Sequence, residues 1–113
     1  MATHDSLDLL QGTLDLMVLR ALAWGQMHGY GISAFIRSRT DGEISIVDAA
    51  LYKALHRLER DRLIEAEWGA SENNRKAKYY RLTAAGKRRL RAEVDAWRRY
   101  TAAVTKVVEP MPA

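Results

Sequence analysis

The feature that most constrains this chain is a change of hydrophobic period in its second half, from helical spacing to alternation and back. Two short alternating segments, 64–68 and 78–82, flank nine polar, turn-rich residues at 69–77. Period-two alternation predicts half-buried strands, and a polar turn between two such strands predicts a β-hairpin. Helical spacing comes before and after this hairpin, so the fold we expect is mainly α (α+β).

Three amphipathic helices and one brief strand are predicted before the hairpin. Thr13 and Asp48 are the expected N-caps of the first and third helices, and Gly25 is the expected stop of the first. The segment 26–29 is predicted to be a turn. The helices cover 13–24, 30 to about 41, and 48–62, and the β-prone run Ile-Ser-Ile-Val forms a strand at 44–47.

The returning strand of the hairpin leads directly into a last helix. Within this strand, period two places Tyr80 and Leu82 on the core face and leaves Tyr79 as the more exposed tyrosine. Thr83 caps the helix, which is expected to run to about Val108 before the prolines. Three compact helices followed by a hairpin make a winged helix-turn-helix, here with an added long C-terminal helix.

Positive charge is concentrated in the second half of the chain. Residues 1–50 carry three basic and six acidic side chains, whereas residues 51–113 carry fifteen basic and eight acidic ones. A polyanion such as a nucleic acid would be attracted to the second half. A solvated, charged helix would give the same composition, so charge alone does not decide between these interpretations.

The composition and motifs exclude several classes of protein. The chain has no cysteine, which removes disulfides, thiolate metal sites and cysteine nucleophiles. It has no apolar run near the ~20 residues of a membrane span, and Met1 to Leu10 lack the features of a signal peptide. His4, His28 and His56 lack a metal-ligand spacing, His28 being most simply a turn residue. We therefore expect a cytoplasmic protein that has no cofactor, metal or membrane contact and is not an enzyme.

The helix predicted at 48–62 has the two faces that a DNA recognition helix needs. Leu51, Leu55 and Leu58 form an apolar stripe that can anchor it, and a major groove ~12 Å wide admits one helix. Lysine and arginine can bond guanine edges or phosphates, and a tyrosine hydroxyl can reach a phosphate. An ordinary surface helix also carries charges, so the pattern is not decisive by itself. The candidate DNA contacts on this helix are Tyr52, Lys53, His56 and Arg57.

The turn at 69–77 and its flanks form the second candidate DNA surface. Basic side chains on a thin projecting hairpin can follow phosphates or enter the minor groove, where the potential is most negative. Asn, Gly and Lys also suit an ordinary exposed turn, so the combination with the preceding helix matters more than either feature. Residues 1–82 are accordingly the predicted DNA-binding domain. The candidate contacts in the hairpin are Asn74, Arg75, Lys76, Lys78 and Tyr79.

The last helix carries an apolar stripe with alternating spacings of four and three residues, close to the heptad seam of a coiled coil. Packing on its own domain or pairing with a second copy would bury this stripe, and we expect pairing because the domain before it is already compact. Two recognition helices ~34 Å apart in a homodimer would read a palindromic operator. Residues 83–113 are therefore the predicted dimerisation helix and tail. The seam consists of Leu90, Val94, Trp97, Thr101, Val104 and Val108.

Trp97 lies in the middle of this seam and has two interpretations. It is either a packing aromatic or a stacking platform for a flat apolar effector at the dimer interface. Stacked rings gain only ~0.5–1.5 kcal/mol beyond their buried area, so the sequence leaves both interpretations open. Trp24 and Trp68 are expected to be structural.

Several short segments, taken together in their order and spacing, resemble one known family. They are LQGTLD at 10–15, MHGYGI at 27–32, LY at 51–52, HRLE at 56–59, KYYRLT at 78–83 and AG at 85–86. This pattern is similar to the PadR family of bacterial transcriptional regulators. The resemblance implies a homodimer joined through the C-terminal helix that represses genes for detoxification, stress or efflux. It also implies release from double-stranded DNA by a small aromatic or cationic effector.

The recognition helix departs from the family's usual pattern at two positions. Ala50 brings no hydroxyl to the position before the Leu-Tyr pair, and Lys53 stands where proline is usual. Ala50 remains a candidate DNA contact, and the lysine charge can replace the lost phosphate bond. We therefore expect a sequence-specific DNA-binding regulator that acts as a ligand-responsive homodimeric repressor. The alternatives are a winged-helix protein-interaction module without specific DNA reading, and a small-molecule carrier or enzyme that uses a pocket around Trp97.

Overall fold

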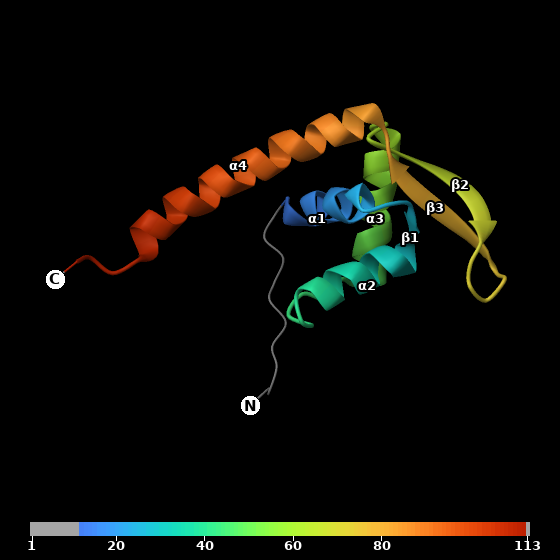
Figure 1. Ribbon diagram of the computed structural model, residues 1–113, viewed down its shortest axis with the longest axis horizontal. Coiled ribbons are helices and arrows are strands. Elements are labelled where there is room, and N and C mark those ends of the chain that lie inside the picture. The colour runs from blue at the N-terminus through green and yellow to red at the C-terminus, as the bar shows by residue number, and fades with distance from the viewer. Residues whose placement is uncertain (1–11, 113) are drawn as a thin grey trace.

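The computed structural model describes residues 12–112 and shows a winged helix-turn-helix from which one long helix extends (Figure 1). Leu7 to Gln11, where the first apolar stretch and the first matching segment begin, lie outside the described residues. The helices are α1 (Thr13–Ala23), α2 (Gly29–Arg39), α3 (Asp48–Arg60) and α4 (Ala84–Val108), and the strands are β1 (Met27–His28), β2 (Ile64–Ala70) and β3 (Lys76–Leu82).

The three strands form one antiparallel sheet in the order β1-β3-β2. The hairpin pairs Ile64 with Leu82 at its base and Ala70 with Lys76 near its tip, so β2 and β3 each extend two residues further toward the tip than predicted. A hydrogen bond from the Ser71 N–H to the Arg75 carbonyl, at 2.8 Å, closes the tip. The hairpin is therefore a long wing that projects beyond the helices (Figure 1).

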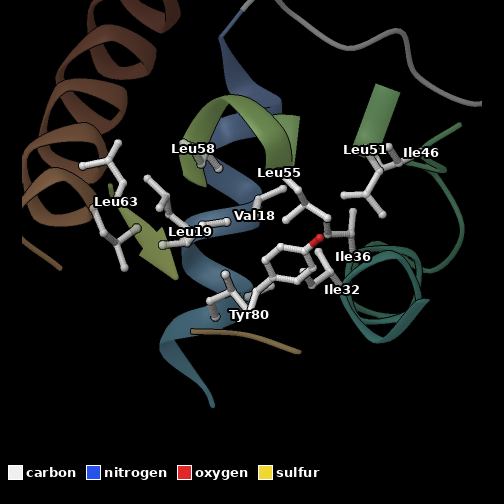
Figure 2. Packing of buried hydrophobic residues seen from close by; sticks show 14 residues of the cluster. Val18, Leu19, Ile32, Ile36, Ile46, Leu51, Leu55, Leu58, Leu63 and Tyr80 are labelled. Carbon is white, nitrogen blue, oxygen red and sulfur yellow. The ribbon is translucent and has the colours of Figure 1, made fainter. Parts of the chain in front are cut away.

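The core gathers around α1, which contacts the other three helices and β3. Tyr80 of β3 is buried in it, as the alternation predicts (Figure 2). Most members of this cluster are aliphatic, and burying each such side chain contributes ~1.5–3 kcal/mol to the free energy of folding. This one cluster therefore holds the domain together. Its members are Val18, Leu19, Ala21, Leu22, Ile32, Ile36, Ile46, Leu51, Leu55, Leu58, Leu63, Ile64, Tyr80 and Leu90.

The start of α4 is held tightly against the end of α3. Thr83 is the N-cap, as predicted, because its Oγ1 accepts the Gly86 N–H at 3.0 Å and donates to the Arg62 carbonyl oxygen at 2.8 Å. A Cβ at position 86 would lie 1.9 Å from the Leu63 carbonyl oxygen, so a larger residue cannot fit there without a shift. The C-terminal end of α4 extends beyond the rest of the domain (Figure 1).

The turn that ends α3 has an unusual backbone conformation. Arg62 has φ +62°, in the left-handed region that favours glycine. Its N–H bonds the Glu59 carbonyl and the Leu63 N–H bonds the Leu58 carbonyl, both at 3.0 Å, which is the pattern of a Schellman motif. A residue with a Cβ costs roughly 1 kcal/mol or more in this conformation.

The strand predicted at 44–47 does not form, and the third strand lies elsewhere. Ile46 is buried in the core, so this apolar run packs against the helices instead of pairing with a strand. The third strand is Met27–His28, which lies in the segment predicted to be a turn. It pairs with Tyr79 and Tyr80 of β3. A run of two residues is too short to show a period. The first and third helices end one and two residues earlier than predicted.

The predicted N-caps of α1 and α3 are also wrong. The cap of α1 is Gly12, in the left-handed conformation with φ +86°, so Thr13 is the first helical residue. The cap of α3 is Val47, and Asp48 lies in the first turn, where its negative charge favours the helix dipole. His28 is more than a turn residue, because its ring Nδ1 caps α2.

Candidate nucleic-acid interface

α3 turns one side to the core and the opposite side to solvent. Its buried residues are Leu51, Ala54, Leu55 and Leu58. At 3.6 residues per turn, four exposed residues lie on the side of α3 that faces away from these buried residues. Two of them are predicted contacts, and the other two follow from the same helical period but were missed. The four are Ala49, Lys53, His56 and Arg60.

Ala50 and Tyr52 lie on the flanks of this outward face. Ala50 is half-buried and packs against the core, so the outward position belongs to Ala49. Tyr52 is exposed and reaches toward the start of α2, where Gly29 leaves room for its hydroxyl. Of these two predicted DNA contacts, Tyr52 is therefore the one with an exposed side chain.

Arg57 is predicted to be a DNA contact, but the structure engages it with α1. Its Nη2 lies 2.5 Å from Asp15 Oδ1, and its Nε donates to Asp15 Oδ2 at 3.3 Å. This hydrogen bonding to the carboxylate raises the pKa of Arg57 above its usual value. The guanidinium therefore ties the recognition helix to α1, and a contact of Arg57 with DNA, which stays a prediction, would have to compete with this ion pair.

Two of the predicted wing contacts are likewise engaged within the fold. The Nζ of Lys78 lies 3.2 Å from Glu59 Oε1 on α3. The hydroxyl of Tyr79 donates to the Ala70 carbonyl at 2.9 Å, and its ring lies 5.3 Å from that of His28. These side chains hold the wing against α3 and β1, which positions the tip.

The tip carries the wing residues that remain available. Asn74 has φ +59°, a conformation that asparagine tolerates well. Lys76 places its Nζ 5.0 Å from the centre of the Trp68 ring. Within the part of the chain that the structure describes, Arg75, Lys76 and Lys53 form no ion pair with an acidic side chain. Among the predicted DNA contacts, these three cations are therefore the ones free to meet a phosphate.

The predicted seam of α4 changes its surroundings along the helix. Leu90 is only 6% exposed and belongs to the core of its own domain, so it is not available for a dimer interface. Val94 is half-buried beside it. Trp97 is 37% exposed and Val108 is 67% exposed. The uncovered part of the seam therefore begins near Trp97 and not at Leu90.

Trp97 lines two hollows in the surface. One, of about 440 Å³, also includes Leu16 and Tyr100. The other, of about 420 Å³, has an apolar wall that includes Phe35 and Val94. Among the described residues, the arginines of this second hollow pair with no acidic side chain. These arginines are Arg20, Arg39 and Arg98.

The remaining charged side chains point to no other chemistry. Arg81 bonds Glu65 at 3.1 Å and Glu67 at 2.6 Å on the outer face of the hairpin. Within residues 12–112, no group of three or more histidine, aspartate or glutamate side chains is arranged to hold a metal ion. In the same range, no helix combines the length and the apolar character of a membrane span.

A recognition helix with an exposed polar face, flanked by a basic wing, defines a winged-helix protein of the DNA-binding class. Residues 18–92 match the transcriptional regulator PadR-like family, and the chain belongs to this family. The family consists of transcription regulators and not of enzymes, so both the resemblance and the predicted fold class are confirmed.

Individual relatives match most of the chain. An uncharacterized protein of Lysinibacillus sphaericus is 39% identical over 90 residues, which are 80% of this chain and 83% of that protein. A transcriptional regulator from Clostridium thermocellum has a TM-score of 0.80 at 31% identity, covering 88% of this chain and 93% of its own. A PadR family transcriptional regulator from Eggerthella lenta has a TM-score of 0.72 at 34% identity, covering 89% and 86%.

Proposed function

We propose that the chain is a homodimeric, ligand-responsive repressor that reads a palindromic operator. The observation that carries this proposal is the outward face of α3, where Lys53 and His56 stand exposed beside a wing with unpaired Arg75 and Lys76. Side chains of these types bond base edges and phosphates. A protein bound to an operator that overlaps a promoter can block transcription by its presence there.

The dimer follows from the part of α4 that the domain leaves uncovered. Tyr100, Val104 and Val107 are exposed together with Trp97 and Val108. An exposed apolar stretch of this length marks an interaction surface. A second copy covers it symmetrically and places a second recognition helix on the DNA, which fits a palindrome.

The effector we propose sits in the hollow between α1, α2 and α4 that Trp97 shares with three unpaired arginines. An aromatic ring has Phe35 and Trp97 to contact, and an anionic group has arginines to pair with. No acidic side chain lines this hollow. Its charge therefore favours an aromatic anion over the cationic compounds that the resemblance also allows.

The test is selection of bound fragments from the source genome by the purified protein, with nonspecific competitor DNA and ~150 mM salt to suppress purely electrostatic binding. We expect enrichment of a palindrome next to one or a few genes, and loss of binding when an aromatic anion of the right shape is added. Reporter transcription that falls when the protein is present would establish repression.

A folded dimer that enriches no fragment would contradict the proposal. It would favour a winged-helix module that binds a protein partner instead. Enrichment with reporter transcription that rises would leave DNA reading intact and replace repression with activation.

A further inference from the structure

Three large aromatic side chains stand exposed around one cleft, although none of them is needed by the core. Tyr30 is 71% exposed, Tyr52 50% and Trp68 60%. All three line a cleft of about 670 Å³ between the start of α2, α3 and the inner side of the wing. Single exposed aromatics are common, but a group gathered at one concavity marks an interaction surface. Trp68 is therefore not the structural residue that the sequence suggests.

The polar groups of the cleft show what kind of partner it takes. Lys76 lies over the Trp68 ring, whereas Lys78 is paired with Glu59, and Glu72 also lines the cleft. The cleft is therefore not a simple cationic pocket. Its uncharged donors include tyrosine hydroxyls and an indole N–H, set beside flat aromatic faces, together with Ser71 and Asn73. A partner that alternates anionic oxygens with apolar rings matches this arrangement, and the sugar–phosphate backbone of DNA is such a partner.

The position of the cleft agrees with this partner. Its lining joins Tyr52 of α3 to residues of the wing, the two elements assigned to DNA. A helix in the major groove has a phosphate backbone along each edge of the groove. A duplex that contacts both α3 and the wing must therefore pass one backbone over the cleft.

We propose that Tyr30 and Trp68 hold this backbone, with the Tyr30 hydroxyl on a phosphate and the Trp68 ring against the adjoining deoxyribose. This inference rests on the proposed DNA-binding function and adds two residues to its interface. Within the described residues the Tyr30 side chain has one ring contact, with His28 at 6.3 Å, and its hydroxyl makes no hydrogen bond. Removing that hydroxyl therefore leaves folding intact.

The first experiment measures operator affinity of Tyr30→Phe by fluorescence anisotropy at ~150 mM salt. The change removes one hydroxyl, and loss of a hydrogen bond to a charged group corresponds to about a tenfold weaker affinity. Ser38→Ala is the matched control, because it removes an exposed hydroxyl from the far end of the same helix. We expect its affinity to equal that of the unaltered protein.

The second experiment uses the indole of Trp68 as the reporter. We expect operator duplex to change the tryptophan emission of the unaltered protein, and this change to disappear in Trp68→Phe. Trp68→Ala should weaken operator binding several-fold. Trp24→Ala, at another exposed tryptophan outside the cleft, should not change it.

The outcomes separate this inference from the function on which it rests. An unaltered protein that binds its operator while Tyr30→Phe and Trp68→Ala bind equally well would overturn the inference alone. An unaltered protein that binds no duplex would overturn both. A single-stranded oligonucleotide that changes Trp68 emission as strongly as the duplex would show that the cleft stacks bases and does not hold a duplex backbone.

Discussion

The two parts of α4 carry one continuous apolar stripe but have opposite surroundings. In the packed part, Ala84 to Val94, the stripe is covered by the chain's own domain and Leu90 is buried. In the free part, Trp97 to Val108, the stripe is much less covered by the described residues, and exposure rises from 37% at Trp97 to 67% at Val108. Periodicity predicts the helix and its apolar side equally well in both parts. It does not predict what packs against that side, because this depends on where the rest of the domain ends.

The largest expected effect is in the free part. Trp97→Glu places a charge on the proposed seam, where burial without a partner costs several kcal/mol. We expect monomers in light scattering and an operator affinity at least ~100-fold lower, because one half-site is lost. Ala102→Glu puts the same charge on an exposed position outside the seam and should remain dimeric. A dimeric Trp97→Glu protein would show that the free part is not the interface.

The next effect is in the packed part. Leu90→Ala should lower the free energy of unfolding by about 3 kcal/mol, since it leaves a cavity in the core. Lys106→Ala is the control in the free part, where the side chain is exposed and lies away from the seam, so the loss should stay within about 0.5 kcal/mol. Urea titrations of both variants provide the measurement. Equal losses would mean that the two parts of α4 do not differ as described.

A smaller effect concerns the N-cap of α4, at the start of the packed part. Thr83→Ala removes the cap of α4 and its hydrogen bond to the Arg62 carbonyl, at a cost of about 1 kcal/mol. Thr105→Ala removes a hydroxyl from an exposed position in the free part and should be nearly neutral. Thermal unfolding of the two variants distinguishes them. A neutral Thr83→Ala would mean that packing alone holds the start of the helix.

The smallest effect is a pH dependence that belongs to the packed domain alone. Burial raises the pKa of Tyr80 above its usual value of 10.0. The folded chain therefore keeps this proton at a pH where the unfolded chain has lost it. Stability from this group is fully present below pH 10 and falls as the pH rises above it, by at most ~1.4 kcal/mol per pH unit. Urea titrations between about pH 8 and pH 11 should show this fall, and Tyr80→Phe should reduce it. An equal slope in Tyr80→Phe would assign the titration to another group.

The regular parts of the fold are predictable because they depend on neighbours in sequence. The alternation at 64–68 and 78–82 gives the hairpin, and Thr83 marks the start of α4, since caps and strands use local patterns. The strand at 44–47 was wrong because Ile46 has the right residue type but no partner strand. The strand Met27–His28 was missed because its partner lies some fifty residues later.

The interface was harder to predict than the fold. Lys53 and His56 follow from the helical period of α3. The ion pair of Arg57 could not be predicted, because Asp15, which binds it, is 42 residues away in sequence. The aromatic cleft joins Tyr30 on α2 to Trp68 on β2, and no local pattern brings these two residues together.

The left-handed conformation of Arg62 has a consequence for the population of folded molecules. A glycine there would adopt φ +62° without the cost that a Cβ imposes. Arg62→Gly should therefore stabilise the chain by about 1 kcal/mol, which corresponds to about fivefold fewer unfolded molecules at equilibrium. The turn that follows the recognition helix is therefore a position where a single substitution would increase the stability of the fold.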